Sequence, residues 1–143
     1  MKVMILLALF FTSHAALATT ECEVVEALKI VKQIQCEKSE GNVYHENGKF
    51  AGIRGVKWYH STGARGGDPV NNMYYHANDA YAGSIGGNWY HPNGERAFAK
   101  DKWYWSNGKY AGTNGGRWYG PTGKYIGTFS NMTEMEQLKF VLD

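Results

Sequence analysis

The chain has 143 residues, with 15 Lys and Arg against 13 Asp and Glu, which gives a formal charge of +2. This length suits one domain or two small ones, and the near-neutral charge does not favour nucleic acid as a partner. Glycine and aromatic residues are unusually frequent, with 18 Gly, 10 Tyr, 6 Phe and 5 Trp, whereas average usage would give roughly 10 Gly in a chain of this length.

Residues 1–18 have the pattern of a secretory signal peptide. Lys2 precedes an apolar run of about nine residues, and Ala16-Leu17-Ala18 follows as the preferred cleavage sequence, with Ser13-His14-Ala15 as the alternative. The apolar run is too short for a membrane span, which needs about 20 residues. We therefore expect an exported protein, periplasmic or extracellular, with no membrane span.

Residues 19–40 contain no Gly, Pro or aromatic residue and predict an N-terminal helix. Thr20 and Glu23 have the spacing of a capping box, in which each side chain accepts from the backbone of the other. Apolar residues then recur at helical spacing. They are Val24, Ala27, Leu28, Val31 and Ile34. This stripe would pack on the rest of the chain or make the helix a site of homo-oligomer formation.

Cys22 and Cys36 are the only cysteines, and export favours their oxidation. A continuous helix would separate their Cα atoms by about 21 Å, whereas a disulfide needs about 7 Å or less. Such a helix would also place both cysteines on its polar side. Three outcomes stay open: an intramolecular bond with a break in the helix near Lys32–Gln35, an intermolecular bond, or free thiols.

Residues 130–143 predict a C-terminal helix. Thr133 and Glu136 repeat the capping box, and Met135, Leu138 and Val141 supply an apolar side. We expect this helix to cover an exposed edge of the region that precedes it.

Between the two helical segments, residues 41–129 are built from six copies of one short repeat. An aromatic pair or its equivalent recurs every 14 to 16 residues. The pairs are Val43-Tyr44, Trp58-Tyr59, Tyr74-Tyr75, Trp89-Tyr90, Trp103-Tyr104 and Trp118-Tyr119. Most are followed by Asn-Gly or Thr-Gly, in which Gly suits the left-handed position of a bulged turn. We predict a mainly β fold with flanking helices, in which six β-hairpins of about 15 residues form one curved or closed sheet.

Strand alternation places the tryptophans on one face of this sheet and the tyrosines that follow them on the other. One face must be core, and the other is either covered by the helices or presented to a ligand. Aromatic rings of this kind stack on sugar rings or enclose a quaternary ammonium group. The predicted ligand-binding residues are Trp58, Trp89, Trp103, Trp118, Tyr59, Tyr90, Tyr104 and Tyr119.

Four histidines share one position of the repeat: His45, His60, His76 and His91. In a closed ring their imidazoles would converge and bind Zn, Ni or Cu, whereas in an open row they would lie far apart. The alternative is that His suits a half-buried strand end. The sequence holds no His-Glu-x-x-His, Gly-x-Ser-x-Gly or phosphate-loop motif, so we expect no enzyme and no cofactor.

The Trp-Tyr-x-x-Asn-Gly pattern of residues 43–129 resembles a group of small symmetric bacterial proteins built from aromatic hairpins around an axis, called β-flowers. It is less similar to the longer choline- and glucan-binding repeats of secreted bacterial proteins. The resemblance implies a non-enzymatic, stress-related or ligand-binding protein of the bacterial envelope. The expected ligand is a small polar or aromatic molecule or a glycan. The alternatives are a purely structural oligomeric assembly and metal binding by the histidines.

Overall fold

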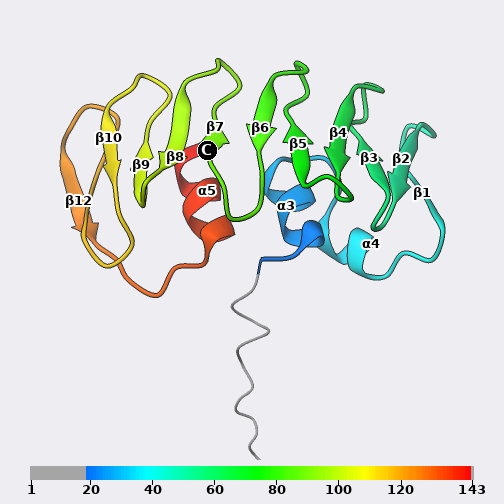
Figure 1. The fold of residues 1–143 in the computed structure, drawn as a ribbon, viewed down its shortest axis with the longest axis horizontal. Coiled ribbons are helices and arrows are strands. Elements are labelled where there is room, and N and C mark those ends of the chain that lie inside the picture. The colour runs from blue at the N-terminus through cyan, green and yellow to red at the C-terminus, as the bar shows by residue number, and fades with distance from the viewer. Residues whose placement is uncertain (1–18, 143) are drawn as a thin grey trace, which may run out of the picture.

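The computed structural model describes residues 19–142, so the predicted signal peptide at residues 1–18 lies outside the described residues. Twelve short strands form one antiparallel sheet in which every strand pairs with its neighbours in sequence (Figure 1). The strands are β1 (Asn42–Tyr44), β2 (Phe50–Ile53), β3 (Lys57–Tyr59), β4 (Arg65–Asp68), β5 (Met73–Tyr75), β6 (Tyr81–Gly83), β7 (Trp89–Tyr90), β8 (Arg96–Ala99), β9 (Lys102–Tyr104), β10 (Tyr110–Gly112), β11 (Arg117–Tyr119) and β12 (Tyr125–Thr128).

The strands are grouped as six hairpins, numbered 1 (β1–β2) to 6 (β11–β12), which confirms the mainly β class and the repeated unit. Figure 1 shows β1 and β12 at opposite ends of the sheet. No pairing joins these two strands within residues 19–142, so the sheet is open and the predicted alternative of a closed ring is wrong. Because each short hairpin pairs only with the next, closure depends on small rotations that add up over the whole row.

The turn of each hairpin has the geometry expected from its sequence. Gly94, Gly108 and Gly123 have φ values of 89°, 86° and 94°, in the left-handed region that favours glycine. In hairpin 4 the Gly94 N–H donates to the carbonyl oxygen of His91 at 2.9 Å, which closes the turn. Hairpin 3 has Asp79 at this position, with φ 72°.

Each hairpin also has a β-bulge, which the sequence did not reveal. The strand register shifts between the two residues of each aromatic pair, so one extra residue of the second strand is left unpaired. The extra residues are Ala51, Gly66, Ala82, Ala97, Ala111 and Ile126. The first five are small and buried. At Gly66 a Cβ atom would lie 2.9 Å from Ile30 Cδ1, so small residues let the helical segments approach the sheet.

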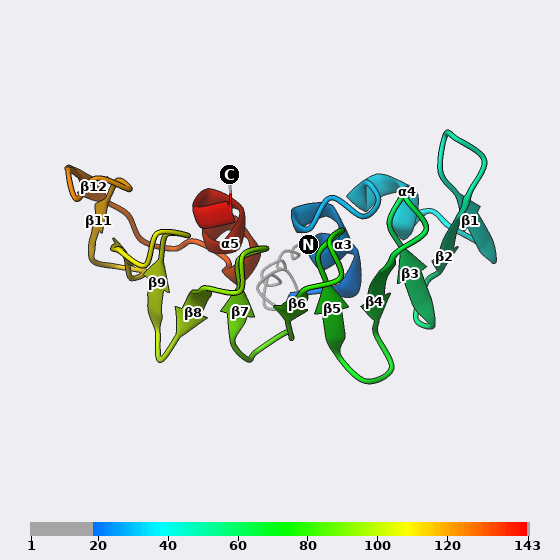
Figure 2. The ribbon, with the colours of Figure 1, turned by 90° about the horizontal axis from the view of Figure 1, so that it is seen from above.

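Three helices lie on one side of the sheet, as Figure 2 shows from above: α3 (Glu21–Ala27), α4 (Gln33–Glu37) and α5 (Glu134–Leu142). The prediction of one N-terminal helix is therefore wrong in detail. The helix breaks between Leu28 and Lys32, earlier than the expected segment, and Lys29 adopts φ 61°. The break buries Ile30, whose side chain packs over hairpin 2.

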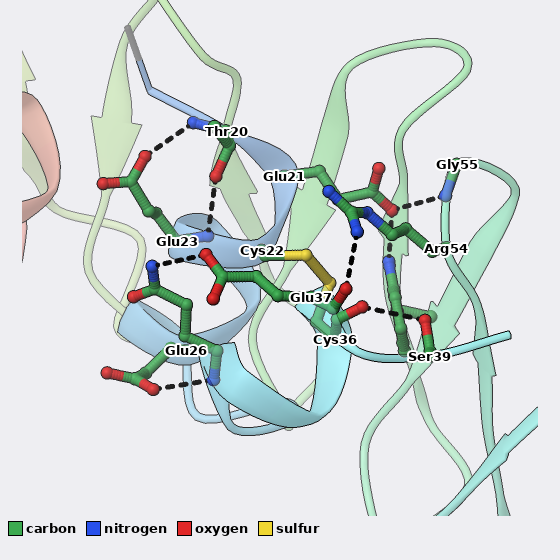
Figure 3. Close-up of a disulfide and its surroundings, with 12 residues drawn as sticks. Thr20, Glu21, Cys22, Glu23, Glu26, Cys36, Glu37, Ser39, Arg54 and Gly55 are labelled. Carbon is green, nitrogen blue, oxygen red and sulfur yellow. Dashed lines mark hydrogen bonds between the residues drawn. A yellow bond between two sulfur atoms is a disulfide. The ribbon is translucent and has the colours of Figure 1, made fainter. Parts of the chain in front are cut away.

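The break allows Cys22 and Cys36 to form an intramolecular disulfide, with Cα atoms 5.4 Å apart (Figure 3). The intermolecular bond and the free thiols are thereby excluded. Both residues are buried, whereas a continuous helix would have placed them on its polar side. The disulfide is compatible with export, and no helix within residues 19–142 is long and apolar enough to cross a membrane.

The C-terminal helix α5 is confirmed, and its capping box forms through Thr133 and Glu136. Its place differs from the expectation, because α5 contacts β8 and β9 in the body of the sheet rather than an outer edge. It also contacts α3, where Lys139 Nζ lies 3.1 Å from Glu26 Oε2. The stripe residue Ile34 is 58% exposed, so the predicted apolar stripe does not extend into α4.

Candidate functional site

The four predicted tryptophans lie on the face of the sheet that the helices cover. Trp58, Trp89, Trp103 and Trp118 are 0–1% exposed and belong to the hydrophobic core. Alternation sorted the aromatic residues into two faces correctly, but it does not tell which face the helices cover. Ligand contact through these indoles stays a prediction, and it would require the helices to move.

Two glutamates join the helices to this inner face through hydrogen bonds. Glu21, the first residue of α3, accepts through Oε2 from Trp58 Nε1 at 2.7 Å and from the Gly55 N–H at 2.6 Å (Figure 3). Glu134, the first residue of α5, accepts from Trp89 Nε1 at 2.7 Å and, at 3.3 Å, from a glycine N–H of the equivalent linker. Both glutamates stand in the sequence Thr-Glu-x-Glu. That shared sequence was the signal that two helices dock in the same way.

The helix α5 crosses the tryptophans at a regular step of three residues. Glu134 meets Trp89 of hairpin 4, and Gln137 accepts from Trp103 Nε1 of hairpin 5 at 2.7 Å. The third step brings the Phe140 ring to 5.5 Å from the ring of Trp118, at an interplanar angle of 87°. Trp118 Nε1 is buried without a hydrogen-bond partner among the described residues. The inner face is thus the surface on which the helices pack.

The opposite face carries a row of residues, which we call the outer row, with one residue from each of the twelve strands. In strand order the outer row is Tyr44, Phe50, Tyr59, Arg65, Tyr75, Tyr81, Tyr90, Arg96, Tyr104, Tyr110, Tyr119 and Tyr125. In every hairpin the two members are directly opposite in the strand register. The four predicted tyrosines, Tyr59, Tyr90, Tyr104 and Tyr119, all belong to this row.

The rings of the outer row are in contact along the sheet. Neighbouring ring centroids are 5.7 to 6.2 Å apart, both within hairpins and between them, which is a favourable range for aromatic pairs. The row is also open to solvent, since Tyr44, Tyr81, Tyr110 and Tyr125 are 37–53% exposed. Burial raises the pKa of the Tyr110 phenol, and the neighbouring phenols add to this shift.

The four histidines lie along the turn edge of the sheet and link successive hairpins. Each Nε2 lies 2.7–2.8 Å from the carbonyl oxygen of the tyrosine in the next hairpin. Because a carbonyl oxygen only accepts, Nε2 must carry the proton. In hairpin 5 Trp105 takes the position of His and donates through Nε1 to Tyr119 O at 2.8 Å. The shared function of the position is therefore to donate one N–H to the next hairpin.

Burial lowers the pKa of both His60 and His76, although the hydrogen bond to a carbonyl opposes the shift. The histidines follow the open sheet in a row instead of converging on an axis. Within residues 19–142, no group of three or more His, Cys, Asp or Glu side chains could hold a metal ion.

A second series of links joins the turns. The amide of Asn47 donates to Ser61 O at 2.9 Å, and Asn78, Asn93 and Asn107 make the same bond to the next turn. Sequence reasoning assigned these asparagines to turn geometry alone. They also fix the distance between hairpins, which keeps the rings of the outer row in contact.

Comparison with known proteins adds no family. No protein-family model matches the chain, and neither the curated proteins nor the solved structures contain a significant match. The fold and the site together define an open, single-sheet protein of β-hairpin repeats with one helix-covered face and one exposed aromatic face.

Proposed function

We propose that the outer row is the binding surface of an exported, non-enzymatic protein of the bacterial envelope, and that its ligand is a glycan. One observation carries this proposal: every strand places a ring or an arginine at the same register position, on the face that the helices of residues 19–142 leave uncovered. A row of twelve strands extends over about 50 Å at 4.7–4.9 Å per strand step. Such a surface suits an extended chain of ring-shaped units better than one small molecule.

Tyrosine is well suited to this contact. Its ring offers a large apolar face for the C–H face of a sugar, and its hydroxyl stays in water or bonds to the ligand. The rings are held by their neighbours and by the short strands, so little conformational entropy is lost when a ligand binds. The exposed members of the row provide this face without any movement of the helices.

The test is binding to soluble polysaccharides, for example laminarin, pullulan, dextran and arabinoxylan, measured by affinity electrophoresis and calorimetry. The double variant Tyr81→Ala/Tyr110→Ala removes two exposed rings. Since each aromatic contact contributes about 0.5–1.5 kcal/mol, the loss of two should weaken binding by about 5- to 160-fold. The control is Val70→Ser, at a loop residue that is 72% exposed and lies outside the outer row.

Two outcomes would contradict the proposal. If the double variant binds every polysaccharide as tightly as the original protein, the outer row is not the binding surface. If no polysaccharide binds and the variant instead changes the mass of the particle in sedimentation, the outer row mediates a structural assembly. Tryptophan fluorescence is a poor reporter of binding here, because the inner-face indoles are buried.

A further inference from the structure

The outer row is interrupted at two places, and both interruptions are arginines. The contacting rings form three blocks, Tyr44 to Tyr59, Tyr75 to Tyr90 and Tyr104 to Tyr125. Arg65 and Arg96 occupy the row positions between them, on β4 and β8. Four strand steps separate the two arginines, which corresponds to about 19 Å along the sheet.

Each arginine borders a shallow hollow in the outer face. The first hollow has a volume of about 300 Å³ and is lined by Lys57, Tyr59, Arg65, Asp68 and Tyr75, among others. The second has a volume of about 200 Å³ and is lined by Glu95, Arg96, Tyr104 and Gly108.

Arg65 is held in position at the first hollow. Its Cζ lies 3.8 Å from the centroid of the Tyr75 ring, and its Nε donates to Asp79 Oδ1 at 3.0 Å. Its side chain is still 56% exposed, and the remaining guanidinium N–H groups can donate to a ligand.

The charges at both hollows cancel. Lys57, Arg65 and Asp68 line the first hollow, and Arg65 is paired with Asp79 at 3.0 Å. Glu95 and Arg96 line the second hollow. Each hollow therefore offers N–H donors and carboxylate acceptors within one small space. A sugar hydroxyl both donates and accepts, so it fits such a site. A carboxylate on the ligand would lose part of its hydration there and gain no net attraction, because the charges of the site are already balanced.

We infer that the two interruptions of the outer row are hydroxyl-binding subsites and that the row takes a neutral glycan rather than an acidic one. This inference rests on the proposed function, and it adds the class of glycan and the two places where hydrogen bonds fix its register. Rings stack on the sugars between the subsites, and the subsites hold hydroxyl groups at intervals of about 19 Å.

The experiment compares polymers that share a backbone and differ in charge: dextran with carboxymethyl-dextran, pullulan with carboxymethyl-pullulan, and hydroxyethyl cellulose with carboxymethyl cellulose. We expect the neutral member of a binding pair to bind about fivefold more tightly, because a ligand carboxylate loses hydration at a site whose own charges are already balanced. Binding of the neutral polymer should not respond to added salt.

Two variants separate a mixed-charge subsite from general surface charge. Arg96→Gln should weaken binding of the neutral polymer about tenfold, because a charged hydrogen-bond donor is lost. The control is Lys38→Gln, which removes the same charge at the end of α4, on the other side of the sheet (Figure 2). Glu95→Gln should weaken binding of the neutral polymer yet strengthen binding of its carboxymethyl partner. Glu40→Gln makes the same charge change outside both hollows and should do neither.

The outcomes distinguish this inference from the proposal beneath it. If the carboxymethyl polymers bind as well as or better than the neutral ones, the inference is overturned while the outer row remains a glycan surface. If Glu95→Gln leaves the preference between a neutral polymer and its carboxymethyl partner unchanged, the hollows are not subsites. If none of the six polymers binds, and laminarin and arabinoxylan do not bind either, the proposed function fails and the inference fails with it.

Discussion

Two glycines four residues apart should respond very differently to the same substitution. Gly112 has φ 156°, and a Cβ atom there would lie 2.4–2.7 Å from three carbon atoms of the Trp118 ring. Trp118 is fully buried against Phe140, so its ring cannot move away freely. Gly108 has φ 86° at the tip of its turn, and a Cβ atom there would meet nothing within 4 Å.

The structure gives the expected magnitudes for Gly→Ala at both sites. At Gly108 only backbone strain is added, which costs about 1 kcal/mol after allowance for the reduced entropy of the unfolded chain. At Gly112 the methyl group also overpacks the core, which adds about 1–3 kcal/mol, and together about 2–4 kcal/mol is expected. That is a large share of the 5–15 kcal/mol that stabilises a typical domain.

The assay is urea unfolding followed by far-ultraviolet circular dichroism, with the midpoint compared at an unchanged slope. The refuting result is a Gly112→Ala variant no less stable than Gly108→Ala. A second measurement tests the cause. In a Trp118→Leu background the added methyl group has room, so Gly112→Ala should cost no more than Gly108→Ala does in the original protein.

Three further predictions concern stability. Burial depresses the pKa of His60 and His76 below the usual 6.5, so the unfolded chain takes up protons at a higher pH than the folded chain does. The urea midpoint should therefore fall as the pH decreases from 7 to 5.5. A His60→Gln/His76→Gln variant should not show this fall. Reduction of the Cys22–Cys36 bond, which closes a 15-residue loop, should lower the free energy of unfolding by about 3 kcal/mol. The urea midpoint should fall when dithiothreitol is added. The double Cys→Ser variant should show the same low midpoint in the absence of dithiothreitol. Glu134→Leu should cost about 1–3 kcal/mol by leaving a buried indole N–H unpaired, whereas Glu134→Gln, which keeps an acceptor, should cost less.

The features that sequence reasoning predicted are those that short segments determine alone. A turn needs only its own few residues, so Gly94, Gly108 and Gly123 were correctly placed at left-handed positions. The capping boxes of α3 and α5 are equally local and both formed. The open or closed form of the sheet depends on all six hairpins together, and no single repeat contains that information.

The break between α3 and α4 shows how tertiary contacts override local preference. The residues from Leu28 to Lys32 include no Gly or Pro, and Lys29 adopts a positive φ that costs a side-chain-bearing residue about 1 kcal/mol. Ile30 packs over Gly66 in return, and the disulfide holds the two short helices together. A glycine 36 positions further along the chain thus helps to determine where the helix ends, which periodicity cannot reveal.

The outer row was only half predicted for a similar reason. The first-strand tyrosines were evident from the repeating pairs. Their partners on the second strands stand six residues further on in every hairpin, but only the strand register, with its bulge, shows that both lie on the same face. Arg65 and Arg96 could not be assigned to an aromatic row from their chemistry. Only the register of β3 with β4 and of β7 with β8 places them there.

The repeats themselves serve as a natural series of substitutions, and they show which chemistry each position requires. Trp105 stands where four hairpins have His, and it keeps the N–H hydrogen bond to the next hairpin. The position therefore requires an N–H donor and does not require a side chain that titrates. Asp79 occupies the turn position that is glycine in the other hairpins, and it keeps the positive φ. The turn therefore requires this backbone conformation and does not require that the residue lack a side chain. Arginine replaces a ring twice, each time beside a carboxylate and a hollow. At the first of these positions the guanidinium still packs against a ring, since Arg65 Cζ lies 3.8 Å from the centroid of Tyr75. What both arginines add to the row is N–H donors, and these are the groups that the proposed subsites would use.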